Sequence, residues 1–242
     1  MSDTVPRSIT IIRRTEHWIA VDKPAGLPSR PGPGHEASAL SVIETQLRAE
    51  GVPHPPGVVH RLDLGTSGVL LFSLSPDGHR ALVEAFRAGR VHKEYFAITA
   101  GHPNPKRGLI DLALRRTSSG LSTPDRQGTP ARTRYETRER FATSALVVAE
   151  PLTGRMHQIR AHLAARGTPV LGDLQYGGAE LRGFRPRPPR LCLHAWRLRL
   201  PPELSGGEPP IACLLPEELE HYLDRLRGTG PGRARARASE LP

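Results

Sequence analysis

The sequence has few cysteines, no long apolar run and no apolar leader, and each shortage excludes a class of protein. Only two cysteines occur in 242 residues, Cys192 and Cys213, and both have apolar neighbours. We therefore expect buried free thiols rather than a disulfide. No stretch approaches the roughly 20 apolar residues of a membrane-spanning helix, and the first ten residues lack the apolar core of a signal peptide. These absences predict a soluble, cytoplasmic protein with no membrane partner.

Motifs for metals and nucleotide cofactors are missing as well. No cysteine or cysteine–histidine spacing resembles a zinc site, the 11 histidines are scattered, and no HExxH pair occurs. Neither GxGxxG nor GxxxxGK[ST] is present. We therefore expect neither a metal nor a nucleotide cofactor.

Negative charge is in short supply relative to positive charge. The 34 basic residues outnumber the 24 acidic ones, which gives a net charge of +10, and all of the basic residues except Lys23, Lys93 and Lys106 are arginines. A GC-rich genome would account for part of the arginine excess. The uncancelled charge nevertheless favours a polyanionic partner, and nucleic acid is the first candidate.

Short apolar segments and amphipathic segments alternate irregularly along the chain, which predicts an α+β fold with a mostly antiparallel mixed sheet flanked by helices. Strands are expected at 9–12, 18–22, 68–73, 94–99, 132–138, 145–150 and 191–200. Helices are expected at 38–50, from Ser75 to the residues before Gly89, at 156–166 and from Pro216 to the residues before Gly228. The polar, turn-rich stretch 115–130 predicts a mobile surface loop.

The segment HRLDLGTSG at 60–68 places a carboxylate between apolar flanks and a turn. Asp63 has two interpretations: a turn former whose side chain accepts backbone N–H bonds, or a functional carboxylate. Its basic neighbours, His60 and Arg61, favour the second.

A second basic cluster lies on or just before the helix expected at 156–166 and contains Arg155, His157 and Arg160. An arginine can keep a buried carboxylate ionised. Tyr95 offers a flat ring on which a nucleic-acid base could stack. An ordinary strand aromatic at Tyr95 and a surface arginine at Arg160 are the alternatives.

These residues carry a resemblance to a known family. HRLDLGTSG resembles the catalytic signature of the RluA-type RNA pseudouridine synthases. Five further segments are similar to motifs of that family in the same order: VDKPAG (21–26), VHKEYFA (91–97), LTGRMHQIRAHL (152–163), LGDLQYG (171–177) and LCLHA (191–195). The resemblance covers the chain from about residue 10 to about residue 226. Ser29–Arg30 and His92 depart from the common pattern, but none of them is a candidate catalytic residue.

The resemblance implies an enzyme, an isomerase that detaches uracil from RNA and rejoins it through carbon without a cofactor. Residues 1–228 would form the catalytic domain, without the S4-type RNA-binding domain that many relatives carry at the N-terminus. Residues 229–242 would form a disordered basic tail. Asp63 would be the catalytic carboxylate, as a nucleophile or as the base that yields a glycal, and Arg160 would pair with it. Tyr95 would stack on the flipped base and assist proton removal from C5.

The resemblance also implies RNA contacts. Arg61 would lie at the RNA entrance, with His60 beside it. Arg155 and His157 would contact phosphate or shape their loop, and Lys23 would stabilise the fold or contact phosphate. The expected partner is a stem-loop of ribosomal or transfer RNA, and we expect a monomer.

Two other functions fit parts of the pattern. A non-catalytic RNA-binding maturation factor could share the fold, although it would not need Asp63, Tyr95 and Arg160 together. A glycoside hydrolase would need a second positioned acid, and no partner for Asp63 stands out in the sequence.

Overall fold

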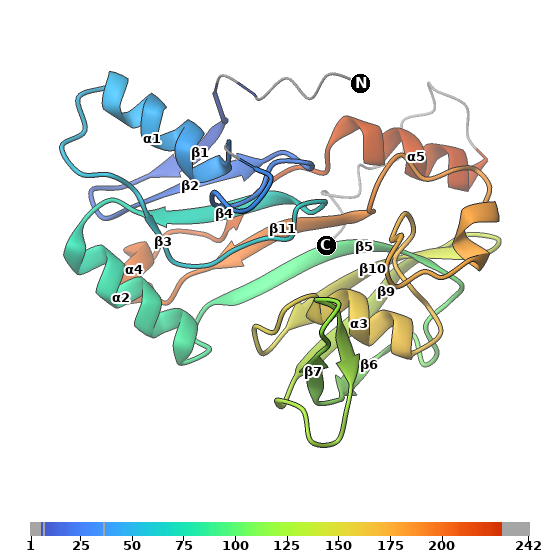
Figure 1. The fold of residues 1–242 in the computed structure, drawn as a ribbon. Coiled ribbons are helices and arrows are strands. Elements are labelled where there is room, and N and C mark those ends of the chain that lie inside the picture. Colours follow the sequence, from blue (N-terminus) through green and yellow to red (C-terminus); the bar gives the residue numbers. More distant parts are fainter. Residues whose placement is uncertain (1–5, 7, 36, 229–242) are drawn as a thin grey trace. The chain divides into compact units, whose positions relative to one another are not determined.

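The computed structural model of the chain describes residues 6, 8–35 and 37–228. These residues divide into two compact units, which Figure 1 shows with the elements labelled. The first contains the described residues up to His92 together with Arg197–Cys213. The second contains Lys93–Trp196 and the described residues from Leu214 onward. The basic tail expected at 229–242 lies outside the described residues.

Three antiparallel strands form the sheet of the first unit in the order β1-β2-β4: β1 (Ile11–Arg14), β2 (Trp18–Lys23) and β4 (Ser67–Ser73). The short β3 (Gly57–Val58) pairs with β4. The first two strands confirm the strands expected at 9–12 and 18–22, although β1 begins at Ile11 and extends to Arg14. All seven residues of β4 are buried, and this explains why its sequence is a continuous apolar run rather than an alternating one.

Two helices flank these strands, and their starts match the sequence signals. Helix α1 (Ala39–Ala49) begins after Ser38, which forms a capping box with Ser41. Helix α2 (Pro76–Arg87) begins after Ser75, whose side chain accepts a bond from Gly78 N. Leu82 and Ala85 of α2 pack against Trp18, Ala20, Val69 and Leu71 in the core of the unit. The unit also contains α4 (Pro202–Ser205) and β12 (Ile211–Ala212).

The sheet of the second unit has the order β5-β10-β9-β6, again antiparallel: β5 (His92–Ala100), β10 (Ser144–Pro151), β9 (Arg132–Arg140) and β6 (Arg107–Asp111). The first three were predicted. β6 was not, because Pro103, Pro105 and Gly108 gave its surroundings the composition of a loop. The α+β fold with antiparallel strand pairing and flanking helices is confirmed.

Helices α3 (Gln158–Ala165) and α5 (Glu217–Arg227) pack on the core of the second unit through Ile159, Leu163, Leu219 and Leu223. A short 3₁₀ turn covers Glu180–Gly183. β11 (Leu193–Arg199) starts in the second unit and ends in the first. Helix α3 begins two residues later than predicted, because His157 adopts a left-handed backbone conformation with φ 53°.

The prediction of a mobile loop at 115–130 was wrong in part. β7 (Leu114–Arg116) and β8 (Ser122–Pro124) form an antiparallel pair there, which projects from the second unit in Figure 1. Arg115 pairs with Asp125 at 3.0 Å, and Leu114 exchanges two backbone hydrogen bonds with Thr129. The strands have three residues each, too few for periodicity to indicate them.

Both cysteines are buried free thiols, as predicted. Burial raises the pKa of Cys192 to about 12, so this thiol stays protonated at neutral pH. Among the described residues, no helix is long and apolar enough to cross a membrane.

Candidate active site

Asp63 lies in a turn directly before β4. Its carbonyl oxygen accepts a hydrogen bond from Thr66 N at 3.0 Å, which closes the turn. Leu62 before it is buried and Leu64 after it is exposed, while Asp63 itself is half-buried. The backbone of Asp63 therefore makes the turn that the sequence suggested. Because the closing bond uses the carbonyl group, a change at the carboxylate leaves it in place.

A neighbouring loop holds this turn through backbone hydrogen bonds. Ser29 Oγ donates to Leu62 O and accepts from Leu62 N, both at 2.9 Å. Gly26 N donates to Leu64 O at 2.8 Å, from a residue whose φ of 82° favours glycine. The two residues flanking Asp63 are thus fixed through their backbone groups.

Lys23 also holds this turn. Its side chain is fully buried, and Nζ donates to the carbonyl oxygens of Leu27 at 2.7 Å, Pro24 at 2.8 Å and Leu64 at 3.4 Å. A buried ammonium group needs such acceptors to offset its desolvation. Of the two roles expected for Lys23, these contacts support the stabilisation of the fold.

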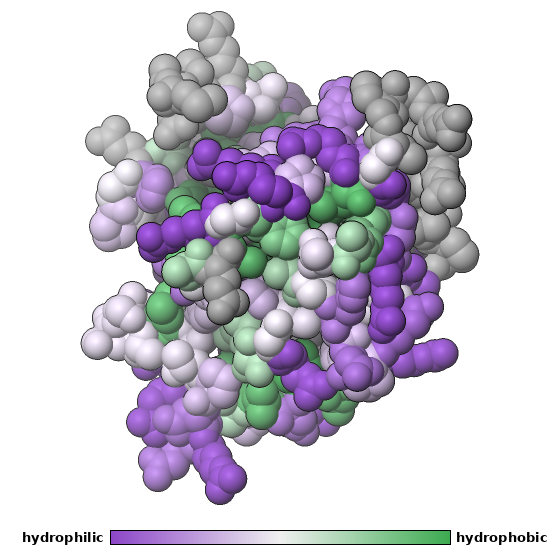
Figure 2. Space-filling view, turned by 90° about the vertical axis from the view of Figure 1, so that its right-hand side faces the viewer, coloured by the Kyte–Doolittle hydropathy of each residue, from purple (hydrophilic) through white to green (hydrophobic). Residues whose placement is uncertain are grey.

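His60 and Arg61 differ in their availability. The His60 ring stacks on Phe86 with centroids 4.6 Å apart, and Nε2 accepts a bond from Leu71 N at 2.9 Å. Arg61 is exposed, and its guanidinium group makes no hydrogen bond or ion pair within the described ranges. Arg61 can therefore meet a phosphate without first breaking an internal contact. Figure 2 shows one face of the molecule, on which strongly hydrophilic side chains surround more apolar ones.

Arg160 of α3 forms a buried ion pair in the second unit. Nε and Nη2 donate to the two carboxylate oxygens of Asp173 at 2.7 and 2.9 Å, and Nη2 also donates to Gln175 Oε1 at 2.7 Å. The guanidinium carbon lies 4.9 Å from the centre of the Tyr176 ring. Arg160 is 6% exposed, so the alternative of a surface arginine was wrong. Two-point pairing of this kind fixes the plane of a guanidinium group.

Arg155 and His157 connect the loop before α3 to other segments of the second unit. Arg155 Nε donates to Pro130 O at 3.0 Å, and His157 Nδ1 lies 3.1 Å from the Tyr176 hydroxyl. The buried Gln158 accepts from Arg155 N and from Thr153 Oγ1, and donates to Arg132 O and Thr133 Oγ1. These contacts support the loop-shaping role of the two that were expected.

Tyr95 is half-buried on β5 and pairs with Ala149 of β10. Lys93 lies two residues earlier on the same face of the strand, and burial lowers its pKa. No group of three or more histidine, cysteine or acidic side chains within 6, 8–35 and 37–228 is arranged to hold a metal ion.

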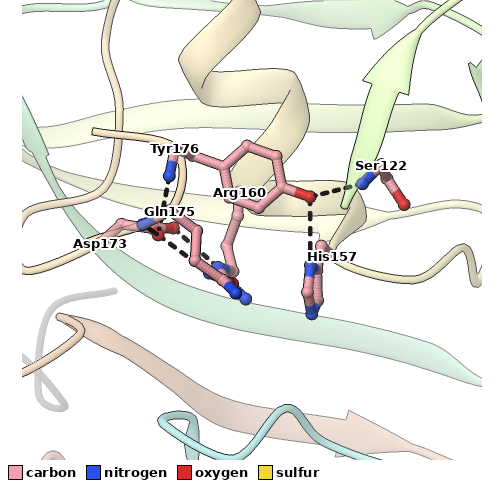
Figure 3. Close-up of polar contacts among 6 residues, drawn as sticks. All are labelled: Ser122, His157, Arg160, Asp173, Gln175 and Tyr176. Atoms are coloured by element: carbon pink, nitrogen blue, oxygen red, sulfur yellow. Dashed lines mark hydrogen bonds and ion pairs between the residues drawn. The ribbon is translucent and has the colours of Figure 1, made fainter. Parts of the chain in front are cut away.

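Three residues that contact Arg160 received no role from the sequence, although LGDLQYG was part of the resemblance: Asp173, Gln175 and Tyr176. Figure 3 shows them around Arg160, with the Tyr176 hydroxyl directed at Ser122 and His157. The signal that could have identified them is the lone acidic residue of that segment, because a buried arginine requires a counter-charge.

Comparison with known proteins identifies the family. Residues 17–165 match the family described as RNA pseudouridylate synthase, a range that includes Asp63, Tyr95 and Arg160. The dual-specificity RNA pseudouridine synthase RluA of Escherichia coli K12 is 38% identical over 79% of this chain and 86% of its own length. The ribosomal large subunit pseudouridine synthase D of Xanthomonas campestris is 34% identical over 96% of this chain and 72% of its own length.

Solved structures agree. Human RNA pseudouridylate synthase domain containing 4 is 28% identical and superposes with a TM-score of 0.75, covering 90% of this chain and 93% of that chain. Human RNA pseudouridylate synthase domain containing 1, also 28% identical, gives 0.68 and covers 96% of this chain and 100% of that chain. The chain belongs to the RNA pseudouridylate synthase family and, within it, to the RluA-type enzymes, isomerases that form pseudouridine in RNA.

Proposed function

We propose that this enzyme acts on specific uridines in stem-loops of ribosomal or transfer RNA and that Asp63 is its catalytic carboxylate. The observation that supports this role most strongly is that both residues flanking Asp63 are fixed. Ser29 holds Leu62, and Gly26 and Lys23 hold Leu64. The relatives named for ribosomal large subunit RNA and for dual specificity support the choice of RNA. We further propose that the enzyme works in the cytoplasm as a monomer.

The reaction breaks the N1–C1′ bond of uridine, turns the base, and joins C5 to C1′. C5 loses one proton and N1 gains one, so nothing is oxidised and no group is imported. A carboxylate can attack C1′ as a nucleophile, or it can remove a sugar proton to yield a glycal. Asp63 can serve either route, and neither needs a cofactor or a metal.

The target atom is not accessible in a stacked helix, so the base must flip out of the RNA. We propose that Tyr95 stacks on the flipped base and assists proton removal from C5. We also propose that Arg160 pairs with Asp63 and orients its carboxylate. The rigid anchoring of Arg160 by Asp173 supports a role that demands a fixed orientation.

Arg61 is the RNA contact that the structure supports best among the five candidates, because it is exposed and its guanidinium group is unengaged within the described ranges. We propose that Arg61 binds the RNA at the entrance of the site. Lys23 and His60 hold the turn of Asp63 and the strand beside it. Arg155 and His157 shape the loop before α3.

Chemical mapping of pseudouridine across ribosomal and transfer RNA tests this proposal. Cells with the gene are compared with a deletion strain, and the deletion is complemented with the wild-type gene or with Asp63→Ala. We expect a site that disappears on deletion, returns with the wild-type gene and stays absent with Asp63→Ala. Restoration of the site by Asp63→Ala would remove Asp63 from the chemistry. An unchanged map would instead favour a binding factor without catalysis.

A further inference from the structure

The β7–β8 hairpin carries exposed positive charge. Residues 114–131 contain Arg115, Arg116 and Arg126 against the single acid Asp125, three positive charges minus one, which leaves +2. Asp125 is paired with Arg115. Arg116 and Arg126 are exposed, and among the described residues their guanidinium groups have no hydrogen-bond or ion-pair partner. Unengaged arginines on a projecting hairpin suit the phosphates of an RNA backbone.

Ser122 fastens this hairpin to the rest of the second unit. It is 3% exposed, Ser122 N donates to the Tyr176 hydroxyl at 2.7 Å, and Ser122 Oγ donates to Met156 O at 2.6 Å. A buried backbone N–H that loses its acceptor costs free energy. The position of β8 therefore depends on the Tyr176 oxygen.

The same tyrosine contacts the surroundings of Arg160. Its ring lies beside the guanidinium group, 4.9 Å from ring centre to Cζ. Tyr176 N donates to Asp173 Oδ1 at 3.1 Å, which is the oxygen that accepts from Arg160 Nη2. One residue thus touches both the hairpin and the arginine, as Figure 3 shows.

His157 joins the group through the hydroxyl. Because Ser122 N–H donates to the Tyr176 oxygen, the tyrosine hydrogen can be donated to His157 Nδ1, 3.1 Å away. His157 has the left-handed conformation directly before α3, three residues ahead of Arg160. A position of this kind is retained in a folded protein only when surrounding contacts determine it. The Tyr176 hydroxyl therefore connects Ser122 of the hairpin to His157 at the start of the helix that carries Arg160.

We infer that Tyr176 is a positioning residue that holds the arginine-bearing β7–β8 hairpin in a fixed position relative to Arg160, so that RNA bound by the hairpin is aligned with the site that Arg160 orients. The inference rests on the proposed roles of RNA and of Arg160. A tyrosine that only stabilised the fold would have no specific effect on RNA binding.

Tyr176→Phe separates the two contacts, since it keeps the ring beside Arg160 and removes the oxygen that holds Ser122. We expect KM for RNA to rise about fivefold, the equivalent of one lost hydrogen bond, while kcat falls less than about twofold. The substrate is unmodified total RNA from the deletion strain. Tyr135→Phe is the control for the loss of a tyrosine hydroxyl: Tyr135 is buried, whereas Tyr176 is half-buried, and the Tyr135 hydroxyl donates to the Pro105 carbonyl at 3.1 Å, away from Arg160 and the hairpin. It should leave KM within about twofold.

A double-mutant cycle tests the link to the hairpin. The double variant Arg116→Ala with Arg126→Ala should raise KM. In the triple variant that also carries Tyr176→Phe, the total rise in KM should be clearly smaller than the product of the two separate factors. Should Tyr176→Phe fail to fold, Ser122→Ala is the second variant. It removes the hydrogen bond from Ser122 Oγ to Met156 O, which also holds the hairpin, and should raise KM as well. A Tyr176→Phe effect on kcat alone, or effects that multiply fully, would overturn the inference.

The same variants are also compared for RNA affinity in the Asp63→Asn background, by fluorescence anisotropy with labelled transfer RNA and ribosomal RNA fragments. Weaker binding after Tyr176→Phe, with no change after Tyr135→Phe, supports the hairpin link even if Asp63 proves not to be catalytic. Unchanged affinity for these RNAs contradicts the link while leaving the proposed catalytic role of Asp63 untouched.

Discussion

Among single residues, the buried pair of Arg160 and Asp173 matters most, because Gln175 and Tyr176 are both held by it. Asp173 is fully enclosed, and its side chain accepts four hydrogen bonds from Arg160, Gln175 and Tyr176. Such a pair contributes little compared with a well-packed apolar pair, but the loss of one partner leaves an uncompensated buried charge.

Asp173→Asn is therefore expected to lower the free energy of unfolding by about 3 to 5 kcal/mol. Urea denaturation followed by circular dichroism measures the loss. Asp77→Asn is the control, because the Asp77–Arg80 pair is 78% exposed on both sides and should contribute no more than about 1 kcal/mol. Equal effects of the two substitutions would contradict the account.

His162 gives a second residue-scale prediction, since burial lowers its pKa while the Leu112 carbonyl and Asp111 oppose the shift. The neutral ring fits its contacts: Nε2–H donates to Leu112 O, and Nδ1 accepts from the Thr133 hydroxyl, whose oxygen already accepts from Gln158. With a folded pKa below the unfolded value, the unfolded state binds the extra proton. Stability is then complete above about pH 6.5 and decreases as the pH falls toward the folded pKa.

Urea midpoints measured between pH 7.5 and pH 5 for the wild type and for His162→Gln test this sign. The variant should be less stable at pH 7.5, because it loses the ring contacts, but its stability should fall less as the pH is lowered. Parallel curves would show that His162 contributes nothing to the acid sensitivity.

Sequence motifs at this scale predicted the candidate residues but not their partners. Asp63, Tyr95 and Arg160 lie in segments whose order resembles the family. Asp173 comes from a loop 13 residues after Arg160, and no helical or strand period joins those positions. For Lys23 the sequence left open whether it stabilises the fold or contacts phosphate, because the three carbonyl oxygens that its ammonium group contacts cannot be identified from the sequence.

At the scale of elements, the loop 171–178 positions Asp173, Gln175 and Tyr176, and its path depends on glycine. Gly172 has φ 77°, and an added Cβ would lie 1.8 Å from Arg190 O. Gly178 has φ 64°, yet an added Cβ would meet nothing within 4 Å. An alanine would be strained at either site, but only at Gly172 would its Cβ also collide with a backbone atom that cannot move aside.

Gly172→Ala should lower the free energy of unfolding by at least about 3 kcal/mol, from left-handed strain plus displacement of the backbone near Arg190. Gly178→Ala should cost only roughly 1 to 2 kcal/mol, the strain alone. Thermal and urea unfolding of both variants measure the difference. If the variants were equally stable, the loop would be free to shift and could not fix Asp173.

Elements with strong end signals were predicted closely. Ser38 and Ser75 start α1 and α2, and Pro216 directly precedes α5. The β7–β8 hairpin was missed because its order depends on distant contacts, above all Ser122 with Tyr176, 54 residues away. Local composition reports flexibility there, while tertiary contacts decide the structure.

At the scale of the whole molecule, the net charge of +10 predicts salt-sensitive binding to RNA. Residues 229–242 contribute Arg233, Arg235 and Arg237 against Glu240. Deletion of 229–242 should weaken RNA binding at low salt and make the slope of log K against log salt shallower by up to about 3. The modified uridine should stay the same, as judged by mapping the product RNA. A change of site would assign the segment a part in recognition.

The most direct test of the central claim is the rate of pseudouridine formation by purified Asp63→Asn. The substitution keeps the turn, because the closing bond uses the Asp63 carbonyl, and removes only the charge. On unmodified total RNA from a deletion strain, we predict a rate reduced more than about a thousandfold, with RNA affinity and thermal stability close to wild type. The control Asp77→Asn should remain within about twofold of wild type. A rate for Asp63→Asn within about tenfold of wild type would contradict the assignment of Asp63 as the catalytic carboxylate.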